Sequence, residues 1–452
     1  MLKNAILFIL ALSPLPFASA RPVWQMLWVC LICLMIIIWV LIRIKNKQAI
    51  APGSHLSKLP LIPIVCWGLF ILWGFLQSFD LGLLQLIEPA NTKSDTVNAL
   101  WTNLGTLSVT PSRTLVNALY FTAHLLFFVM VFSIYKRRRM AHGFFQATSM
   151  IVTLYALYGF TVYILGNDTI LWYDKWAYKN SLTSTFVNRN SFATYAGMGL
   201  ICTLTWGINY FRSTVTHGLT SDTRLQDFIN RFMEKGWLFF ISGFILMSAL
   251  MLTGSRAGMT STIIGLAVFL SLWQMGGTSA LKINKGYFFA AAALLILGAM
   301  ALSGDQLQMR LMADASDDQR FKAYPLIWQA IMERPLTGYG LGSFIDVFRQ
   351  VRDETVRVFF DRGHSDYLEL MLTAGIPMTL ALLLVPTSIM IILVQALRKA
   401  SDYRLEIIAG ISVTVIVGLH AILDFSLQMP AVSYMYTAIM AVSLAVAVRS
   451  KA

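Results

Sequence analysis

A short polar stretch, RGHSD at residues 362–366, precedes a long apolar run and holds residue types that transfer protons and bind anions. Charged groups cost free energy in hydrocarbon but little at a water interface, so this stretch is expected at a membrane surface. Nearby arginines disfavour the imidazolium, so a neutral His364 could accept a proton from a hydroxyl. Asp366 or Glu369 could orient the ring, or could do no more than cap the following helix.

Three helices that are expected to start at the outer surface share a polar, basic beginning: VNRNSF, TGSRAG and RGHSDY. The residues that could cap these helices are Asn190, Ser255 and Ser365. Free backbone N–H groups and the positive end of a helix dipole attract anions. The arginines that would complete a phosphate or diphosphate site are Arg189, Arg256, Arg362 and, from a loop above, Arg320. Each arginine could instead snorkel to lipid head groups.

Two further residues are candidates for lining the same site. Arg310 could contribute positive charge or form a surface ion pair with neighbouring aspartates, and Asp424 could cap a turn or face an arginine. The adjacent carboxylates of SDDQR make a poor metal cage by themselves, and the sequence has no glycine-rich nucleotide loop. We therefore expect neither a metal nor a cofactor.

The composition indicates an integral membrane protein. Of 452 residues, 57% are hydrophobic and 13% are charged, with a mean hydropathy of +0.66, whereas soluble domains carry about 25% charged residues. Apolar windows long enough to cross a bilayer recur throughout, so a single all-α polytopic membrane domain is expected over 1–452. The four cysteines fall inside apolar windows and are expected to be packing residues.

About twelve transmembrane helices are expected. Their predicted ranges are 4–20, 22–43, 59–79, 115–135, 142–165, 190–211, 237–253, 256–274, 286–303, 365–397, 405–423 and 430–449. The first of them imitates a secretory signal, but Pro14 and Pro16 break it before the cleavage-like site, so we expect it to be retained.

The orientation follows from the basic residues, which gather in turns after alternate spans, such as RIKNK and KRRR. That face is expected to be cytoplasmic and to hold both termini. The net charge of +13 is therefore a signal of topology and gives no support to nucleic-acid binding.

The longest outer segment, 304–364, is expected to be a periplasmic loop between the ninth and tenth spans. Its apolar residues recur at helical spacing around Phe321 and again around Phe348, which predicts two amphipathic helices on the membrane surface. Between them, TGYGLGSF supplies a glycine hinge.

Four motifs in this order resemble the O-antigen ligase and Wzy-type polymerase superfamily over about 185–440. They are LTGSRAGM, DDQRFKAYPLIWQAIMERPLTGYGLGSF, HSDYLELMLTAGIP and HAILDFSLQMPA. The resemblance implies an inverting, metal-independent transferase of the bacterial inner membrane, which moves a glycan from undecaprenyl diphosphate to an acceptor sugar hydroxyl at the periplasmic face. It also implies that Arg256 and Arg320 bind the diphosphate and that His364 activates the hydroxyl.

Arg189, Arg310, Arg362, Asp366 and Asp424 have no such match and are expected only to line the site. The acceptor could be lipid A core, as for a ligase, or a lipid-linked repeat unit, as for a polymerase of exopolysaccharide or O-antigen. A secondary transporter is an alternative from another class, although its polar residues would be expected at mid-membrane depth and in two related halves.

Overall fold

A computed structural model describes residues 2–45, 59–80, 105–215, 226, 229–275, 319–398 and 403–450. Eight helices of these residues are long and apolar enough to cross a membrane, which confirms a helical, multi-pass membrane protein. They are α2 (Pro22–Lys45), α3 (Leu61–Ser78), α6 (Pro111–Ile134), α7 (Arg138–Ile164), the segment Ile229–Leu252 ending in α10 (Trp237–Leu252), α11 (Arg256–Gln274), α16 (Ile376–Leu397) and α18 (Pro430–Ser450).

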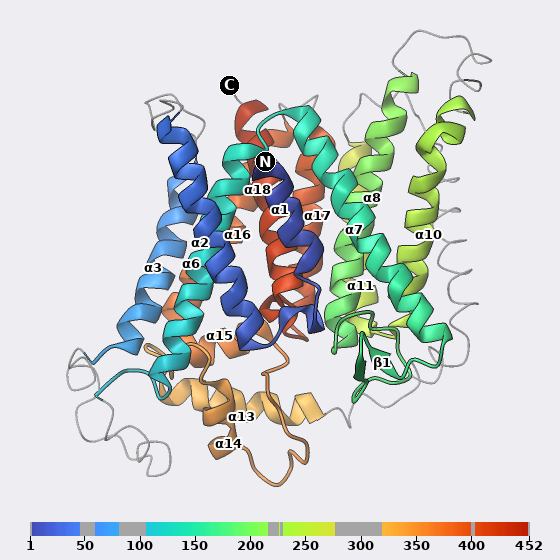
Figure 1. The fold of residues 1–452 in the computed structure, drawn as a ribbon. Coiled ribbons are helices and arrows are strands. Elements are labelled where there is room, and N and C mark those ends of the chain that lie inside the picture. Colours follow the sequence, from blue (N-terminus) through green and yellow to red (C-terminus); the bar gives the residue numbers. More distant parts are fainter. Residues whose placement is uncertain are drawn as a thin grey trace.

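Three more helices lie among these eight in the bundle (Figure 1), namely α1 (Leu2–Leu12), α8 (Arg189–Val215) and α17 (Arg404–His420). The first predicted span is shorter than expected, because the chain leaves α1 before Pro14 and Pro16 and re-enters helix only at a short 3-10 turn. The predicted ninth span, 286–303, lies outside the described residues.

The centre of the bundle is α18, which contacts α6, α16 and α17. Of its membrane-spanning window, 89% is buried inside the protein, far more than in any other candidate span of the described residues. Its sequence, PAVSYMYTAIMAVSLAVAV, is rich in alanine and also contains serine and threonine. Small side chains let helix backbones approach closely in lipid, where no hydrophobic force drives helices together.

The predicted tenth span is two helices, not one. α15 (Asp366–Ala374) ends at Gly375, whose φ is +81°, and α16 follows directly. A side chain at Gly375 would collide with the carbonyl group of Leu336. The buried side chain of Gln77 fixes this break, because its Nε2 donates to the carbonyl oxygens of Thr337 (2.8 Å) and Thr373 (3.0 Å).

The two predicted amphipathic helices form a layer across one end of the bundle (Figure 1), as α13 (Gln319–Glu333) and α14 (Phe344–Val351). They share a small core with α15 that includes Ile327, Phe348 and Leu372. The glycines of the predicted hinge all have positive φ, at Gly338 (+64°), Gly340 (+101°) and Gly342 (+81°). The hinge prediction is therefore confirmed, and it lets the chain reverse between the two helices.

The connection between α7 and α8 contains a small antiparallel hairpin, β1 (Thr169–Ile170) and β2 (Tyr173–Asp174). Lys175, which follows it, is 1% exposed, and its Nζ donates to Asn167 Oδ1 and to the carbonyl oxygen of Ser181, both at 2.8 Å. Burial lowers the pKa of Lys175 to about 8.

Candidate functional site

His364 lies in the segment that joins α14 to α15, directly beneath α13. Its φ is +47°, and the hydroxyl of Tyr324 on α13 donates to its backbone carbonyl at 2.8 Å. The ring stands edge-on between Phe360 and Phe425, with centroid distances of 5.1 and 5.0 Å. The side chain is 15% exposed, so the imidazole is held in an apolar slot that still reaches solvent.

The carboxylate that faces this ring belongs to Asp424, in the turn between α17 and α18. Its Oδ1 lies 3.6 Å from His364 Nδ1, and its side chain is fully buried. This separation is longer than a hydrogen bond, as is common for catalytic pairs without substrate. A carboxylate at Nδ1 favours the tautomer that leaves Nε2 free to accept a proton.

Asn188, immediately before α8, holds Asp424 in place and was missed by the sequence analysis. Its Nδ2 lies 3.3 Å from each carboxylate oxygen of Asp424, while its Oδ1 accepts from the backbone N–H of Asn190 at 2.8 Å. The predicted cap at Asn190 was therefore wrong by two residues, because Asn188 caps α8. The only signal for it was a second asparagine in VNRNSF.

Asp424 is negatively charged near neutral pH in these surroundings. Burial acts to raise its pKa, but contact with His364 and the proximity of His420 and Arg320 outweigh it and lower the pKa of Asp424 to about 2. Arg320, in the first turn of α13, donates from Nη1 to the carbonyl oxygen of Leu423 at 3.1 Å. This hydrogen bond places Arg320 beside the turn that carries Asp424.

Asp366 and Glu369 do not orient His364. Asp366 accepts from the backbone N–H of Leu427 and from Gln428 Nε2, both at 3.2 Å, and so ties α15 to the short helix η5 (Ser426–Gln428). Glu369 accepts from the N–H of Gly363 at 2.7 Å and faces Arg362 at 3.4 Å. The carboxylates of Asp366 and Glu369 therefore stabilise the segment around the histidine. The carboxylate that faces the His364 ring is that of Asp424.

The helix starts differ in how open they are to an anion. The first N–H of α15, from Asp366, already donates to the carbonyl oxygens of Ala421 (2.9 Å) and Asp424 (3.2 Å), so this N–H is not available to an anion. In α11, Ser255 accepts from the N–H of Gly258 as predicted. Arg256 at the start of α11 is exposed, and Gly258 lets this turn pack closely on Ala193 of α8.

The remaining predicted residues are placed as follows. Arg189 begins α8 and lies over the ring of Tyr178 at 5.3 Å. The hydroxyl of Tyr178 lies within reach of the charges of Asp424, Arg320 and Arg189. Arg310 lies outside the described residues.

The fold and this site define a helical membrane protein with a partly exposed histidine that faces a buried carboxylate at one end of the bundle, with arginines nearby. Residues 241–384 match the family described as O-Antigen ligase, from within α10 to within α16. This match confirms the resemblance to the O-antigen ligase and Wzy superfamily and includes Arg256, Arg320 and His364. None of the curated proteins matches the chain significantly.

Proposed function

We propose that the protein transfers a glycan from undecaprenyl diphosphate to an acceptor sugar hydroxyl, as an O-antigen ligase-like glycosyltransferase. The family match supports a function of the ligase or polymerase type. The observation that carries the chemistry is the His364–Asp424 pair, with its carboxylate buried, charged and held by Asn188.

In the proposed reaction, His364 Nε2 takes the proton from the acceptor hydroxyl while the oxygen attacks the anomeric carbon of the donor sugar. The bond between that carbon and the diphosphate oxygen breaks as the new glycosidic bond forms, so the configuration inverts. Asp424 stabilises the imidazolium that results. The diphosphate leaves with its charge, which Arg256 and Arg320 stabilise as it develops.

Three other arginines are assigned supporting roles. Arg189, near Asp424 and Tyr178, adds positive potential on the donor side. Arg362, paired with Glu369, shapes the segment that carries His364. Arg310 stays a predicted lining residue. No step in this scheme requires a metal or another cofactor.

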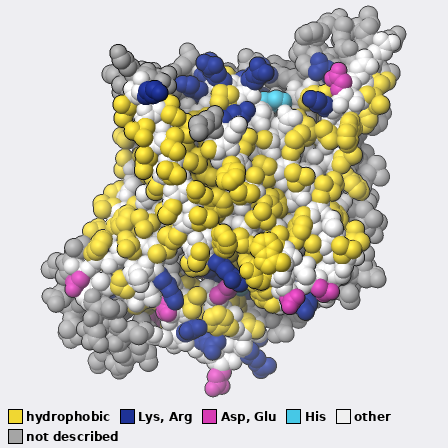
Figure 2. Space-filling model, in the orientation of Figure 1, with side chains coloured by type: hydrophobic (Ala, Val, Ile, Leu, Met, Phe, Trp, Pro, Cys, Tyr) yellow, Lys and Arg dark blue, Asp and Glu magenta, His cyan; other side chains and the backbone are white. Residues whose placement is uncertain are grey.

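The site is proposed to face the periplasm of a bacterial inner membrane, with both termini cytoplasmic. Figure 2 shows a broad apolar belt, with lysine and arginine side chains gathered at one end and mixed charges at the other. Both ends of the chain lie at the basic end (Figure 1), and the α13–α14 layer lies opposite. This arrangement supports the orientation, since cytoplasmic turns carry the excess of basic residues.

The proposal is tested by transfer with purified protein in detergent containing EDTA and an undecaprenyl-diphosphate glycan, offering lipid A core and a second donor glycan as separate acceptors. Product on lipid A core indicates a ligase, and longer lipid-linked chains indicate a polymerase. His364→Ala and Arg256→Ala should abolish either product.

The matched control is Arg349→Ala, which removes an exposed arginine of α14 that lies over Phe359 in the same layer. It should retain full activity. If neither acceptor is used, or if both site variants keep full activity, the proposed transferase function is refuted. A secondary transporter would then be the alternative to test.

A further inference from the structure

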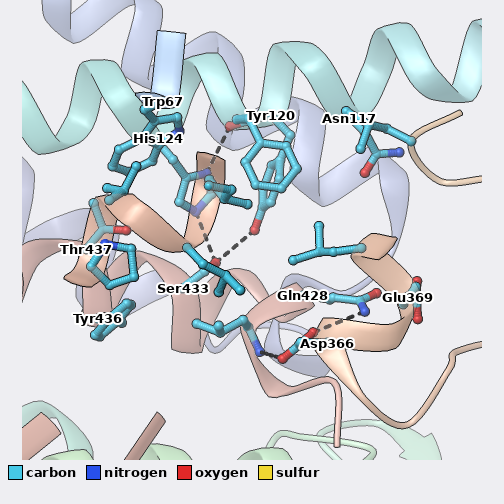
Figure 3. A pocket seen from close by; sticks show the side chains of 18 of the residues that line it. Trp67, Asn117, Tyr120, His124, Asp366, Glu369, Gln428, Ser433, Tyr436 and Thr437 are labelled. Atoms are coloured by element: carbon cyan, nitrogen blue, oxygen red, sulfur yellow. Dashed lines mark hydrogen bonds between the residues drawn. The ribbon is translucent and has the colours of Figure 1, made fainter. Parts of the chain in front are cut away.

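A pocket of about 220 Å³ lies inside the bundle, walled mainly by α6, α15, α16 and α18 (Figure 3). Its lining includes Arg362, Asp366 and Glu369, which lie close to His364 in the chain. His364 itself is not among the lining residues and faces Asp424. One short segment therefore borders two compartments, the histidine site on one face and this pocket on the other.

The lining residues of α6 extend over a length close to the thickness of one membrane leaflet. They form one helical stripe, namely Asn117, Tyr120, Phe121, His124 and Phe128. At about 1.5 Å of rise per residue, this stripe covers roughly 16 Å. Half of a bilayer's hydrocarbon core is about 15 Å thick. A lipid chain that enters at the outer surface would therefore end near the floor of the pocket.

Several polar groups of the pocket are already bonded to one another (Figure 3), although the buried indole N–H of Trp67 has no partner among the described residues. Ser433 Oγ lies 2.9 Å from the hydroxyl of Tyr120 and 3.0 Å from His124 Nε2, while His124 Nδ1 lies 2.9 Å from the carbonyl oxygen of Tyr120. The hydroxyl of Tyr436 is bonded to Thr414 at 3.4 Å. These groups therefore do not require polar partners from a ligand, and the rest of the wall is mainly apolar. Such a lining suits hydrocarbon.

The pocket and the arginine-bearing starts of α8 and α11 are formed by different helices. Arg189 and Arg256 begin α8 and α11, which pack on one another and on α17. The pocket is instead lined mainly by α6, α15, α16 and α18, with one residue from α3. In Figure 1, α6 and α16 lie on the other side of the bundle from α8 and α11. If the arginines bind the donor diphosphate, the pocket is left for the acceptor, which must approach the general base from the other side.

We propose that this pocket binds one acyl chain of the acceptor lipid and thereby presents the acceptor's sugar to His364. The inference rests on the proposed transferase function. An unbranched acyl chain matches a pocket whose α6 wall extends over about one leaflet, whereas a methyl-branched polyprenyl chain is much longer than a leaflet. The proposal therefore assigns the acceptor to the acylated class of glycolipid and the polyprenyl chain of the donor to another surface.

Photolabelling tests the pocket without requiring turnover. The protein in nanodiscs is irradiated with a lipid whose acyl chain carries a diazirine or, separately, with a polyprenyl phosphate that carries one, and the labelled residues are identified by mass spectrometry. The acyl probe should label residues deep in the pocket, such as Met440. Labelling there by the polyprenyl probe instead, or by neither probe, would overturn the proposal.

Two neighbouring residues of α16 provide a matched pair of variants. Leu383 lines the pocket, whereas Leu384 points outward and is 50% exposed. Leu383→Trp should fill the pocket and abolish labelling by the acyl probe, and Leu384→Trp should not. Thr437→Phe fills the pocket from another wall, on α18. It should have the same effect on labelling, so the test can still be made if Leu383→Trp does not fold.

Kinetics separate the two proposals. Leu383→Trp should raise the KM for an acylated acceptor by about tenfold or more, with unchanged KM for the donor and an unchanged rate on the same oligosaccharide without acyl chains. An equal loss on both acceptors would overturn the role in acceptor binding. If the acyl probe labels the pocket but the protein transfers glycan to no acceptor, the proposed function is refuted. The pocket would then bind membrane lipid only, and the assignment of the acceptor would also be overturned.

Discussion

The replacement Asp424→Asn tests the role of the carboxylate at His364, because it keeps the shape of the side chain and removes its charge. At 3.6 Å, a full imidazolium facing the carboxylate gains about 4 to 5 kcal/mol for an effective dielectric constant of about 20. Only part of that charge develops in the transition state. The transfer rate should therefore fall by a factor on the order of 10² to 10³.

The assay is the single-turnover rate of glycan transfer at saturating acceptor, measured for the two single variants and for the double variant His364→Ala with Asp424→Asn. If the residues act as a pair, Asp424→Asn should add little to the loss caused by His364→Ala, because interacting residues are not additive. Asp346→Asn, at a carboxylate that pairs with Arg113 on the surface, is the control and should be neutral. Additive losses, or a folded Asp424→Asn protein with nearly normal activity, would refute the reasoning.

Three further predictions concern Asn188, Gly375 and Lys175. Asn188→Leu removes the amide that bonds to both oxygens of a buried, charged carboxylate, so it should cost about 1.5 to 3 kcal/mol of stability and slow transfer, as read by thermal unfolding and the same assay. Gly375→Ala forces a side chain against a carbonyl group at positive φ, so it should lower the melting temperature, whereas Gly68→Ala, which meets nothing within 4 Å, should not. For Lys175, the folded pKa of about 8 lies below the ordinary 10.5, so the unfolded chain binds more protons between these values and stability should rise with pH across that window. Lys175→Met should remove this rise in the melting temperature, and a rise that persists in the variant would assign it to another group.

The sequence by itself determined the local features of this protein. Hydropathy over windows of helix length is sufficient to recognise spans, because each helix satisfies its own backbone in lipid. The caps at Ser255 and Ser365 involve residues only three positions apart. The hinge depends on the backbone of its own glycines, which adopt positive φ angles. The amphipathic helix that carries Arg320 was readable from its period for the same reason.

The tertiary structure alone decided which groups meet. Asp424 and Asn188 are 236 positions apart in the chain, and both reach the site of His364 only because α8 and α17 pack together. Periodicity shows which face of a helix is apolar but not which helix will cover it. The sequence therefore offered only the nearest carboxylates, Asp366 and Glu369, as possible partners of the histidine. The break at Gly375 was hidden for a similar reason, since it is enforced by the carbonyl of Leu336 and by Gln77 from a distant helix.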